Sequence, residues 1–129
     1  MDHRSAAAVV LALMVHIVVP SAARAQDLGD GERLFRQRCA ACHALEAGQN
    51  KAGPHLDGII GRRAGSVENA RYSPAMQQSQ IIWEEQALDN FLANPRKAVP
   101  GTSMMIGVPN GDQRKAIIAY LKTLPGTAN

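Results

Sequence analysis

The sequence has few aromatic residues and no strong excess of one charge. Only five aromatics, two Phe, two Tyr and one Trp, occur in 129 residues, a small supply of large side chains for a core. No apolar run reaches the roughly 20 residues that a membrane-spanning helix needs. The formal net charge is only +3, without the concentrated basic stripe that is typical of nucleic-acid binders. No long run of like charge appears either. Length and composition therefore favour one folded domain over a disordered chain.

The N-terminus has the pattern of an export signal. Arg4 precedes an apolar run over residues 6–19, and residues 23–25 give the small-x-small pattern of a cleavage site. The run fits a signal-peptide core of about 7–15 residues and is too short to cross a bilayer. We therefore predict that residues 1–25 are a cleaved secretory signal peptide and that residues 26–129 form one domain. An uncleaved amphipathic anchor is the alternative.

Apolar residues at helical spacing predict three helices, over about residues 28–41, 84–93 and 112–124. Asp30 and Asp112 are the expected N-caps of the first and third helix. The segments between them are rich in glycine and proline and show no strand alternation. Long loops are uncommon in a small domain unless they have a function. Helices, long loops and few aromatics together predict a chain that wraps a large apolar group.

The only two cysteines lie in a C-x-x-C-H motif at residues 39–43. Two thiols three residues apart lie on one side of a helical turn, where Cys39 and Cys42 can add to the two vinyl groups of a porphyrin. The adjacent His43 then lies under the iron as an axial ligand. The motif is typical of covalent attachment of c-type haem.

Three alternatives for this motif are weighed beside haem. A thiol–disulfide redox pair uses the same C-x-x-C, but it is expected near a βαβ pattern, which this sequence lacks. A structural disulfide is an option in an oxidising compartment. A zinc site could add His55 to the motif, although its separation from His43 does not match the usual histidine spacing of about 3–5 residues.

A second axial ligand is expected from the turn-rich segment over residues 100–104. Its last residue, Met104, offers a soft thioether, and His/Met ligation raises the reduction potential of a haem. A methionine alone is more often a core filler, but the Pro-Gly turn before it and the separate haem motif favour Met104 as the ligand. The neighbouring Met105 is the competitor, and Met76 lies in a polar stretch without such a turn.

The sequence resembles the small class I cytochromes c, of the mitochondrial type and its bacterial periplasmic relatives. The likeness covers nearly all of residues 31–124, and its order and spacing are more specific than the short haem motif alone. It rests, besides that motif, on the following residues: Gly31, Phe35, Gly53, Pro54, Leu56, Gly58, Gly61, Arg62, Tyr72, Trp83, Leu88, Leu92, Asn94, Pro95, residues 100–104, Ile117, Tyr120 and Leu121.

The resemblance implies an all-α class I cytochrome c fold, with three main helices and long loops around one covalent haem c. It implies that the carbonyl of Pro54 accepts a hydrogen bond from the histidine ligand. It also implies that the small Gly31 lets the first and last helices cross closely. Three further residues are implied to lie around the haem propionates: Arg62, Tyr72 and Trp83.

Departures from the family pattern concern the surroundings of the haem. Phe91 stands where the family often has a tyrosine whose hydroxyl contacts the methionine sulfur. Ser103 replaces a lysine of mitochondrial members, and Asn50 replaces a frequent histidine. The basic ring at the haem edge is therefore thinner. Its candidates for docking a redox partner are Arg38, Lys51, Arg96 and Lys97.

The predicted function is that of a soluble, monomeric, periplasmic one-electron carrier with a single haem c, and not an enzyme. With both axial positions filled by His43 and Met104, the iron offers no open site to a substrate. A dedicated haem subunit of one dehydrogenase or oxidase is the alternative. A peroxidase-like enzyme would need acid/base groups at an open site, for which His55 gives weak support. No nucleic acid and no stable membrane insertion after cleavage are expected.

Overall fold

The computed structural model describes residues 21–126. Most of the predicted signal peptide lies outside this range. The described part is helical, in the order α1 (Ser21–Arg38), α2 (Pro74–Gln78), α3 (Glu85–Ala93), α4 (Pro95–Ala98) and α5 (Gly111–Leu121). Extended pairing within residues 21–126 is limited to one isolated antiparallel bridge between Arg63 and Ile82. The predicted all-α architecture is confirmed.

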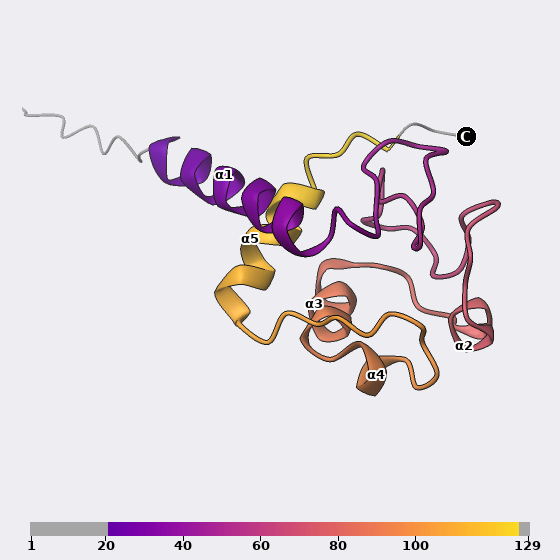
Figure 1. The fold of residues 1–129 in the computed structure, drawn as a ribbon. Helices are drawn as coiled ribbons and strands as arrows, with labels where there is room; N and C mark the ends of the chain where they lie inside the picture. Colours follow the sequence, from indigo (N-terminus) through magenta and orange to yellow (C-terminus); the bar gives the residue numbers. More distant parts are fainter. Residues whose placement is uncertain (1–20, 127–129) are drawn as a thin grey trace, which may run out of the picture.

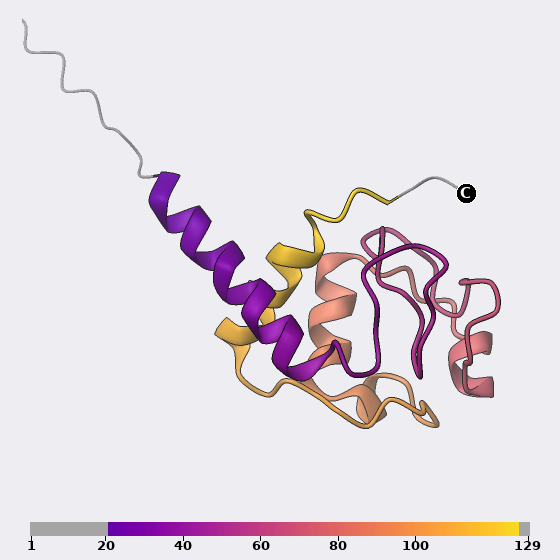
Figure 2. The ribbon, with the colours of Figure 1, turned by 45° about the horizontal axis from the view of Figure 1, so that its top comes forward.

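Helices α1 and α5 cross, and α3 packs against α5 (Figures 1 and 2). The loops that follow α1 lie at its C-terminal end, away from the start of the helix, together with the short helix α2. Among the described residues, no helix is both long enough and apolar enough to cross a bilayer.

The crossing of α1 and α5 depends on a glycine. A Cβ atom added at Gly31 would lie 2.2 Å from the carbonyl oxygen of Ala116 and 2.7 Å from Cβ of Tyr120. Only a residue without a side chain allows this approach. One turn further along α1, the ring of Phe35 lies 6.1 Å from that of Tyr120, between centroids. The structure therefore confirms the predicted role of Gly31.

Helix α1 is longer at its start and shorter at its end than predicted. It begins at Ser21, so Asp30 lies inside it and forms an exposed pair with Arg33 at 3.0 Å instead of capping the helix. The segment before Asp30 contains no proline, and its three alanines, the residue with the highest helix propensity, offset the unfavourable Gly29. The helix ends at Arg38, before the cysteine motif rather than within it.

Helix α3 begins within one residue of the prediction, whereas the cap of α5 was assigned wrongly. The N-cap of α5 is Asn110, whose side chain accepts the backbone N–H of Gln113 at 3.0 Å. Asp112 lies in the first turn, where its negative charge still stabilises the helix by interacting with the helix dipole. The helix ends at Leu121, and hydrogen-bonded turns carry the chain on to residue 124.

Two short helices were not predicted. Helix α2 follows Ser73 and helix α4 follows Asn94, and each of these caps accepts a backbone N–H of the first turn. Each helix has proline near its start, where the missing N–H costs nothing. Pro95 therefore ends α3 and begins α4. Helix α2 also buries Met76, although the sequence around this residue is polar.

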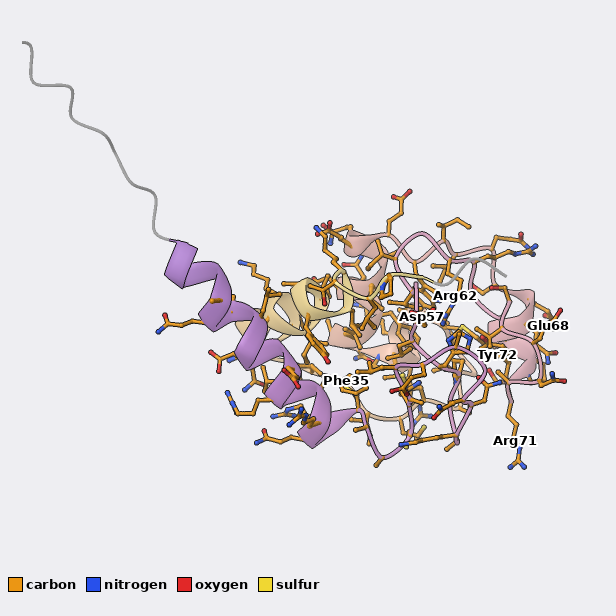
Figure 3. The ribbon with its side chains drawn as sticks, turned by 90° about the horizontal axis from the view of Figure 1, so that it is seen from above. Phe35, Asp57, Arg62, Glu68, Arg71 and Tyr72 are labelled. Atoms are coloured by element: carbon orange, nitrogen blue, oxygen red, sulfur yellow. The ribbon has the colours of Figure 1, made fainter. Side chains whose placement is uncertain are left out.

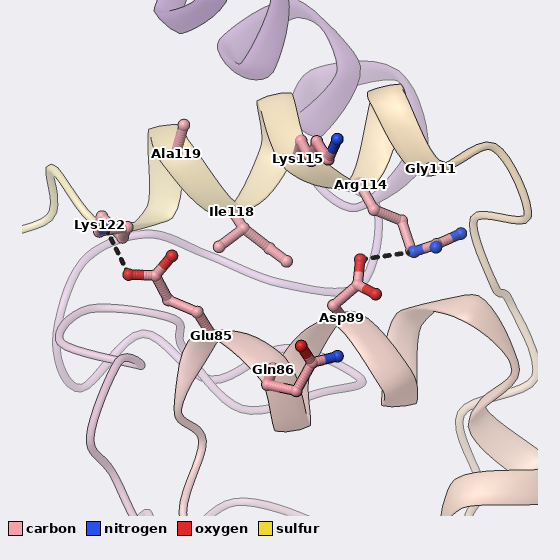
Figure 4. Close-up of a pocket in the computed structure, with 9 residues that line it drawn as sticks. All are labelled: Glu85, Gln86, Asp89, Gly111, Arg114, Lys115, Ile118, Ala119 and Lys122. Atoms are coloured by element: carbon pink, nitrogen blue, oxygen red, sulfur yellow. Dashed lines mark hydrogen bonds and ion pairs between the residues drawn. The ribbon is translucent and has the colours of Figure 1, made fainter.

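A groove separates α3 from α5 on the outside of the molecule (Figure 4). It measures about 390 Å³. Ion pairs bridge it at both ends, Glu85 with Lys122 and Asp89 with Arg114. Arg114 also donates to the carbonyls of Val108 and Pro109, at 3.0 and 2.7 Å. The groove contains neither a histidine nor a cysteine, so the chemistry of the motif lies elsewhere.

One hydrophobic cluster forms the core. It joins α1, α3 and α5 to the loops between them. Its buried members are Leu34, Phe35, Ile59, Ala64, Met76, Trp83, Leu88, Phe91, Leu92, Val99, Val108, Ile117, Ile118 and Leu121.

Candidate functional site

The C-x-x-C-H motif occupies the turn that follows α1. The N–H groups of Cys42 and His43 both donate to the carbonyl of Cys39, at 3.0 and 2.9 Å. This turn brings the backbones of Cys39, Cys42 and His43 together. Both cysteines are free thiols and partly buried. Burial raises the pKa of the Cys39 thiol, although the charge of Arg38 opposes this.

His43 is held by the segment that follows it. Its Nδ1 donates to the carbonyl of Pro54 at 2.8 Å. A Cβ at Gly53 would lie only 2.4 Å from Cε1 of His43, so the glycine is needed for the ring to lie here. Because Nδ1 carries the donated proton, Nε2 keeps its lone pair. The Pro54 contact implied by the resemblance is present.

His43 is also held in its neutral form. Burial lowers its pKa below the usual 6.5, and the charges of Arg62 and Lys51 lower it further, while the hydrogen bond to Pro54 acts in the opposite direction. Neutral imidazole is the form that binds metals. The ring is therefore prepared to coordinate through Nε2.

The two candidate methionines differ in their surroundings. Met104 is partly buried and packs against the core cluster. Its backbone N–H donates to the hydroxyl of the buried Thr102 at 3.3 Å, which fixes the turn before it. Met105 is 62% exposed and Ile106 is 55% exposed. Of the two thioethers, only that of Met104 packs against the core.

Arg62 lies among the loops after the motif (Figure 3). Its Nη1 donates to the carbonyl of Asp57 and its Nη2 to that of His55, both at 2.9 Å. Its Nε is buried without a hydrogen-bond partner. Burial lowers the pKa of the guanidinium. Nearby, the hydroxyl of Tyr72 accepts the N–H of Val67 at 3.2 Å, which leaves its own proton for another acceptor.

Trp83 is placed next to Arg62 by backbone pairing. The N–H of Trp83 donates to the carbonyl of Arg62 at 2.8 Å, and its own carbonyl accepts from Gly61 at 3.0 Å. The indole is buried, with its centroid 4.9 Å from that of Phe91. Phe91 has no hydroxyl to offer a methionine sulfur, as the sequence already indicated.

Sequence reasoning missed the role of His55 and Asn50. The Asn50 amide accepts the N–H of His55 at 3.1 Å and donates to the carbonyl of Glu68 at 3.0 Å, so it ties two loops together. His55 is buried, and its Nδ1 has no hydrogen-bond partner. Both residues line a cleft of about 570 Å³ that Arg62 and Glu68 also border. The sequence contains no signal for these contacts, because each joins loops of irregular structure.

The basic residues expected at a docking face lie at the surface around the motif and on α4. Arg38 ends α1, and Arg96 and Lys97 lie on α4. Lys51 differs from them, since its ammonium group donates to the carbonyl of Ala40 at 2.8 Å and is thereby tied to the motif turn.

The residues present fit a covalently held haem. The thiols of Cys39 and Cys42 are free, His43 offers a neutral nitrogen, and Met104 offers a soft sulfur at the core. Cys39, Tyr72 and Met104 all pack against the hydrophobic cluster that contains Trp83. The unpartnered Nε of Arg62 suits a carboxylate such as a haem propionate.

The alternatives fit less well. Across residues 21–126, no three His, Cys, Asp or Glu side chains come together to hold a metal ion, so the motif and His55 do not assemble a zinc site. The two cysteines are not joined in a disulfide. These features together define a c-type haem protein.

Comparisons with known proteins give the family. Residues 28–125 match the family model described as cytochrome c. A cytochrome c-type protein, cyt cy, of Rhodobacter capsulatus is 41% identical over 111 residues, which span 85% of this chain but only 55% of that relative. Cytochrome c2 iso-2 of Magnetospirillum molischianum is 44% identical over 67% of this chain and 90% of its own length. The solved structure of cytochrome cH from Methylobacterium extorquens superposes with a TM-score of 0.69, at 39% identity over 75% of this chain and 98% of that one.

The chain belongs to the cytochrome c family. It carries covalently attached haem c and acts as a monohaem electron carrier, as its relatives do, rather than as an enzyme. The resemblance drawn from the sequence is thereby confirmed.

Proposed function

We propose that this protein is a periplasmic carrier that accepts one electron from a membrane or periplasmic donor and passes it to an oxidase or another acceptor. Cys39 and Cys42 attach the haem, and His43 and Met104 ligate its iron. The observation that carries this proposal is the fixed, neutral imidazole of His43, whose Nδ1 is bound to Pro54 at 2.8 Å and whose Nε2 is therefore available. When bound, the haem supplies the one-electron couple of its iron.

The residues around the haem act by holding it rigidly. The Pro54 carbonyl fixes the orientation of the His43 ring, and an oriented ligand raises the affinity of the site. Arg62, Tyr72 and Trp83 provide donors or apolar surface at the propionate side. If His43 and Met104 both ligated the iron, a bound haem would offer no open position to a substrate and would supply electron transfer alone.

The attachment and the ligands are tested separately. Acid–acetone extraction should leave the haem with the polypeptide, and haem in the solvent phase would contradict attachment through the cysteines. The oxidised protein should show the weak long-wavelength band of an iron–methionine bond, and Met104→Ala should lose it while Met105→Ala keeps it. The reverse result would move the ligand by one residue.

Export is proposed from the sequence pattern of residues 1–25. Cleavage after Ala25 would give a mature chain that begins at Gln26. N-terminal sequencing of the native protein tests this directly. A chain that retains residues 1–25 would favour the uncleaved anchor.

The docking face is proposed to be the haem edge with its surrounding cations Arg38, Lys51, Arg96 and Lys97. Positive charge there would steer an acidic partner and act mainly on the encounter rate. The rate of reduction by a membrane cytochrome complex or a periplasmic dehydrogenase should therefore fall with ionic strength, because the screening length is only about 10 Å at 0.1 M.

A charge reversal with a matched control tests this face. Arg96→Glu/Lys97→Glu should slow reduction at low salt and matter little at high salt. The control Arg33→Glu/Lys115→Glu makes the same change of net charge at exposed residues of α1 and α5 and should have a smaller effect. Equal effects of the two variants, or none, would place docking elsewhere.

The size of the native particle distinguishes a free carrier from a dedicated haem subunit of a larger complex. Size-exclusion chromatography of a native extract, followed by the haem absorbance, should show the protein as a monomer. Elution with a dehydrogenase or oxidase would favour the subunit.

A further inference from the structure

The described part of the chain contains three methionines, which differ strongly in how far solvent reaches them. Met76 is only 8% exposed and belongs to the core cluster, while Met104 is partly buried and packs against that cluster. Met105 is 62% exposed. Because an oxidant attacks a thioether only where it can reach the sulfur, Met105 is the most accessible of the three to a dissolved oxidant.

The loop between α4 and α5 holds Met105 in this exposed position (Figure 1). Near the start of the loop, the N–H of Val99 donates to the carbonyl of Pro95 at 2.9 Å. Near its end, the N–H of Val108 donates to the carbonyl of Leu92 at 2.7 Å. Both ends are thus fastened at the junction of α3 and α4, so the exposure of Met105 is a feature of the fold rather than of a loose chain end.

Met105 and its neighbour Ile106, which is 55% exposed, form a pair of consecutive exposed apolar side chains. A Cβ atom added at the next residue, Gly107, would lie 3.1 Å from Cδ of Pro95, the first residue of α4. The pair therefore lies close to α4, the helix that carries two of the cations proposed for the docking face. Apolar side chains rimmed by charge are typical of a surface that binds another protein.

We propose that Met105 is an oxidation site, and that its conversion to the sulfoxide weakens docking of the redox partner. The proposal rests on the docking face proposed above and adds a chemical control of that face. The oxidant is a peroxide, represented by hydrogen peroxide. The sulfur of Met105 donates an electron pair to one peroxide oxygen, so that the S–O bond forms as the O–O bond breaks. The other oxygen takes both protons and leaves as water, so the sulfur is oxidised and the peroxide is reduced.

The sulfoxide changes the surface but not the core. An apolar side chain becomes polar where the partner is expected to cover it, while Met104 keeps its packing against the core cluster. At limiting partner concentration and high ionic strength, the rate of reduction should fall by about threefold or more, because part of the apolar transfer energy of the side chain is lost. Sulfoxide reductases reverse the modification, so the loss of rate is reversible.

The first experiment treats the purified, oxidised holoprotein with hydrogen peroxide and follows each methionine by peptide mass spectrometry. Met105 should gain one oxygen atom before Met76 or Met104 does, and the haem absorption spectrum should stay intact. Conversion of Met76 or Met104 as fast as that of Met105 would overturn the proposal.

The second experiment measures the rate of reduction by a membrane cytochrome complex before and after the peroxide treatment. Met105→Gln makes the side chain polar without an oxidant, so this variant should be as slow as the oxidised wild type. Met105→Leu keeps an apolar side chain of similar size that cannot form a sulfoxide, so peroxide should leave its rate unchanged. An oxidised wild type that reacts at the full rate, or a Met105→Leu protein that peroxide slows equally, would refute the role of Met105.

Three readouts separate this proposal from the haem site on which it rests. Reduction by ascorbate, which needs no docked protein, should proceed at one rate in all these forms, and a slower rate after oxidation would refute docking as the affected step. A sulfoxide reductase supplied with a dithiol should restore the rate with the membrane complex, and a rate that stays low would contradict the sulfoxide as the cause. Loss of the iron–methionine band while Met105 alone is oxidised would instead identify Met105 as the ligand, which contradicts the proposed ligation.

Discussion

Replacing Gly31 by alanine should separate the two helices that hold the ends of the domain together. The new Cβ would lie 2.2 Å from the carbonyl oxygen of Ala116 and 2.9 Å from its carbonyl carbon, where ordinary contacts begin at 3.4 Å. Both atoms belong to the backbone, so no side-chain rotation can relieve the overlap. Helix α5 therefore has to move away from α1.

The expected loss of stability is about 0.5–3.5 kcal/mol. Overpacking of a close contact typically costs about 1–3 kcal/mol. Moving α5 also weakens the contact between Phe35 and Tyr120, and an aromatic pair contributes about 0.5–1.5 kcal/mol beyond its buried area. The higher helix propensity of alanine offsets about 1 kcal/mol of this sum.

The same helix provides the matched control. A Cβ atom added at Gly29 would meet nothing within 4 Å, so Gly29→Ala should stabilise the protein by up to about 1 kcal/mol through helix propensity alone. Guanidinium denaturation of the oxidised holoproteins, followed by circular dichroism, measures both changes. If the two variants differ by less than about 1 kcal/mol, the close crossing at Gly31 does not limit stability and the reasoning fails.

Three further predictions follow from the geometry of the site and of the helix pairs. Gly53→Ala should displace the ring of His43, because the new Cβ would lie 2.4 Å from Cε1, and an unchanged haem absorption spectrum would contradict this. Arg114→Met should lower the free energy of unfolding by about 1–3 kcal/mol, because it leaves the partly buried Asp89 without its 2.7 Å partner. Lys122→Met removes an exposed ion pair and should lower it by less than about 1 kcal/mol. Equal losses in denaturation experiments would argue against burial as the cause. A chain with both cysteines changed to serine, made without haem, should lose much of its helical circular dichroism signal, because the haem replaces large core side chains that the sequence lacks. A native-like cooperative thermal transition of this chain would refute the prediction.

Features that depend on neighbours in the sequence were predictable. The C-x-x-C-H turn, the Pro54 contact eleven residues later and the body of α3 all follow from local pattern or from the family resemblance. The role of Gly31 was implied by the same resemblance, and the close approach of α5 to this glycine agrees with it. These elements contain residues of the proposed haem site.

Other features could not be read from the sequence. Helix α2 has only five residues and α4 only four, which is too short for apolar periodicity to emerge. The N-cap of α5 was misassigned because Asn110 and Asp112 are both good caps and only geometry separates them. The burial of His55 arises from the folding of one loop over another, which no residue spacing encodes.

The bridge made by Asn50 has a consequence for how the loops respond to acid. Its amide ties the N–H of His55 to the carbonyl of Glu68, at a position where the family often has a histidine. An imidazole that accepts a hydrogen bond loses this ability when it is protonated, so a tie of that kind weakens in acid. An amide has no proton to gain in this range. The two loops of this chain should therefore stay joined at acidic pH.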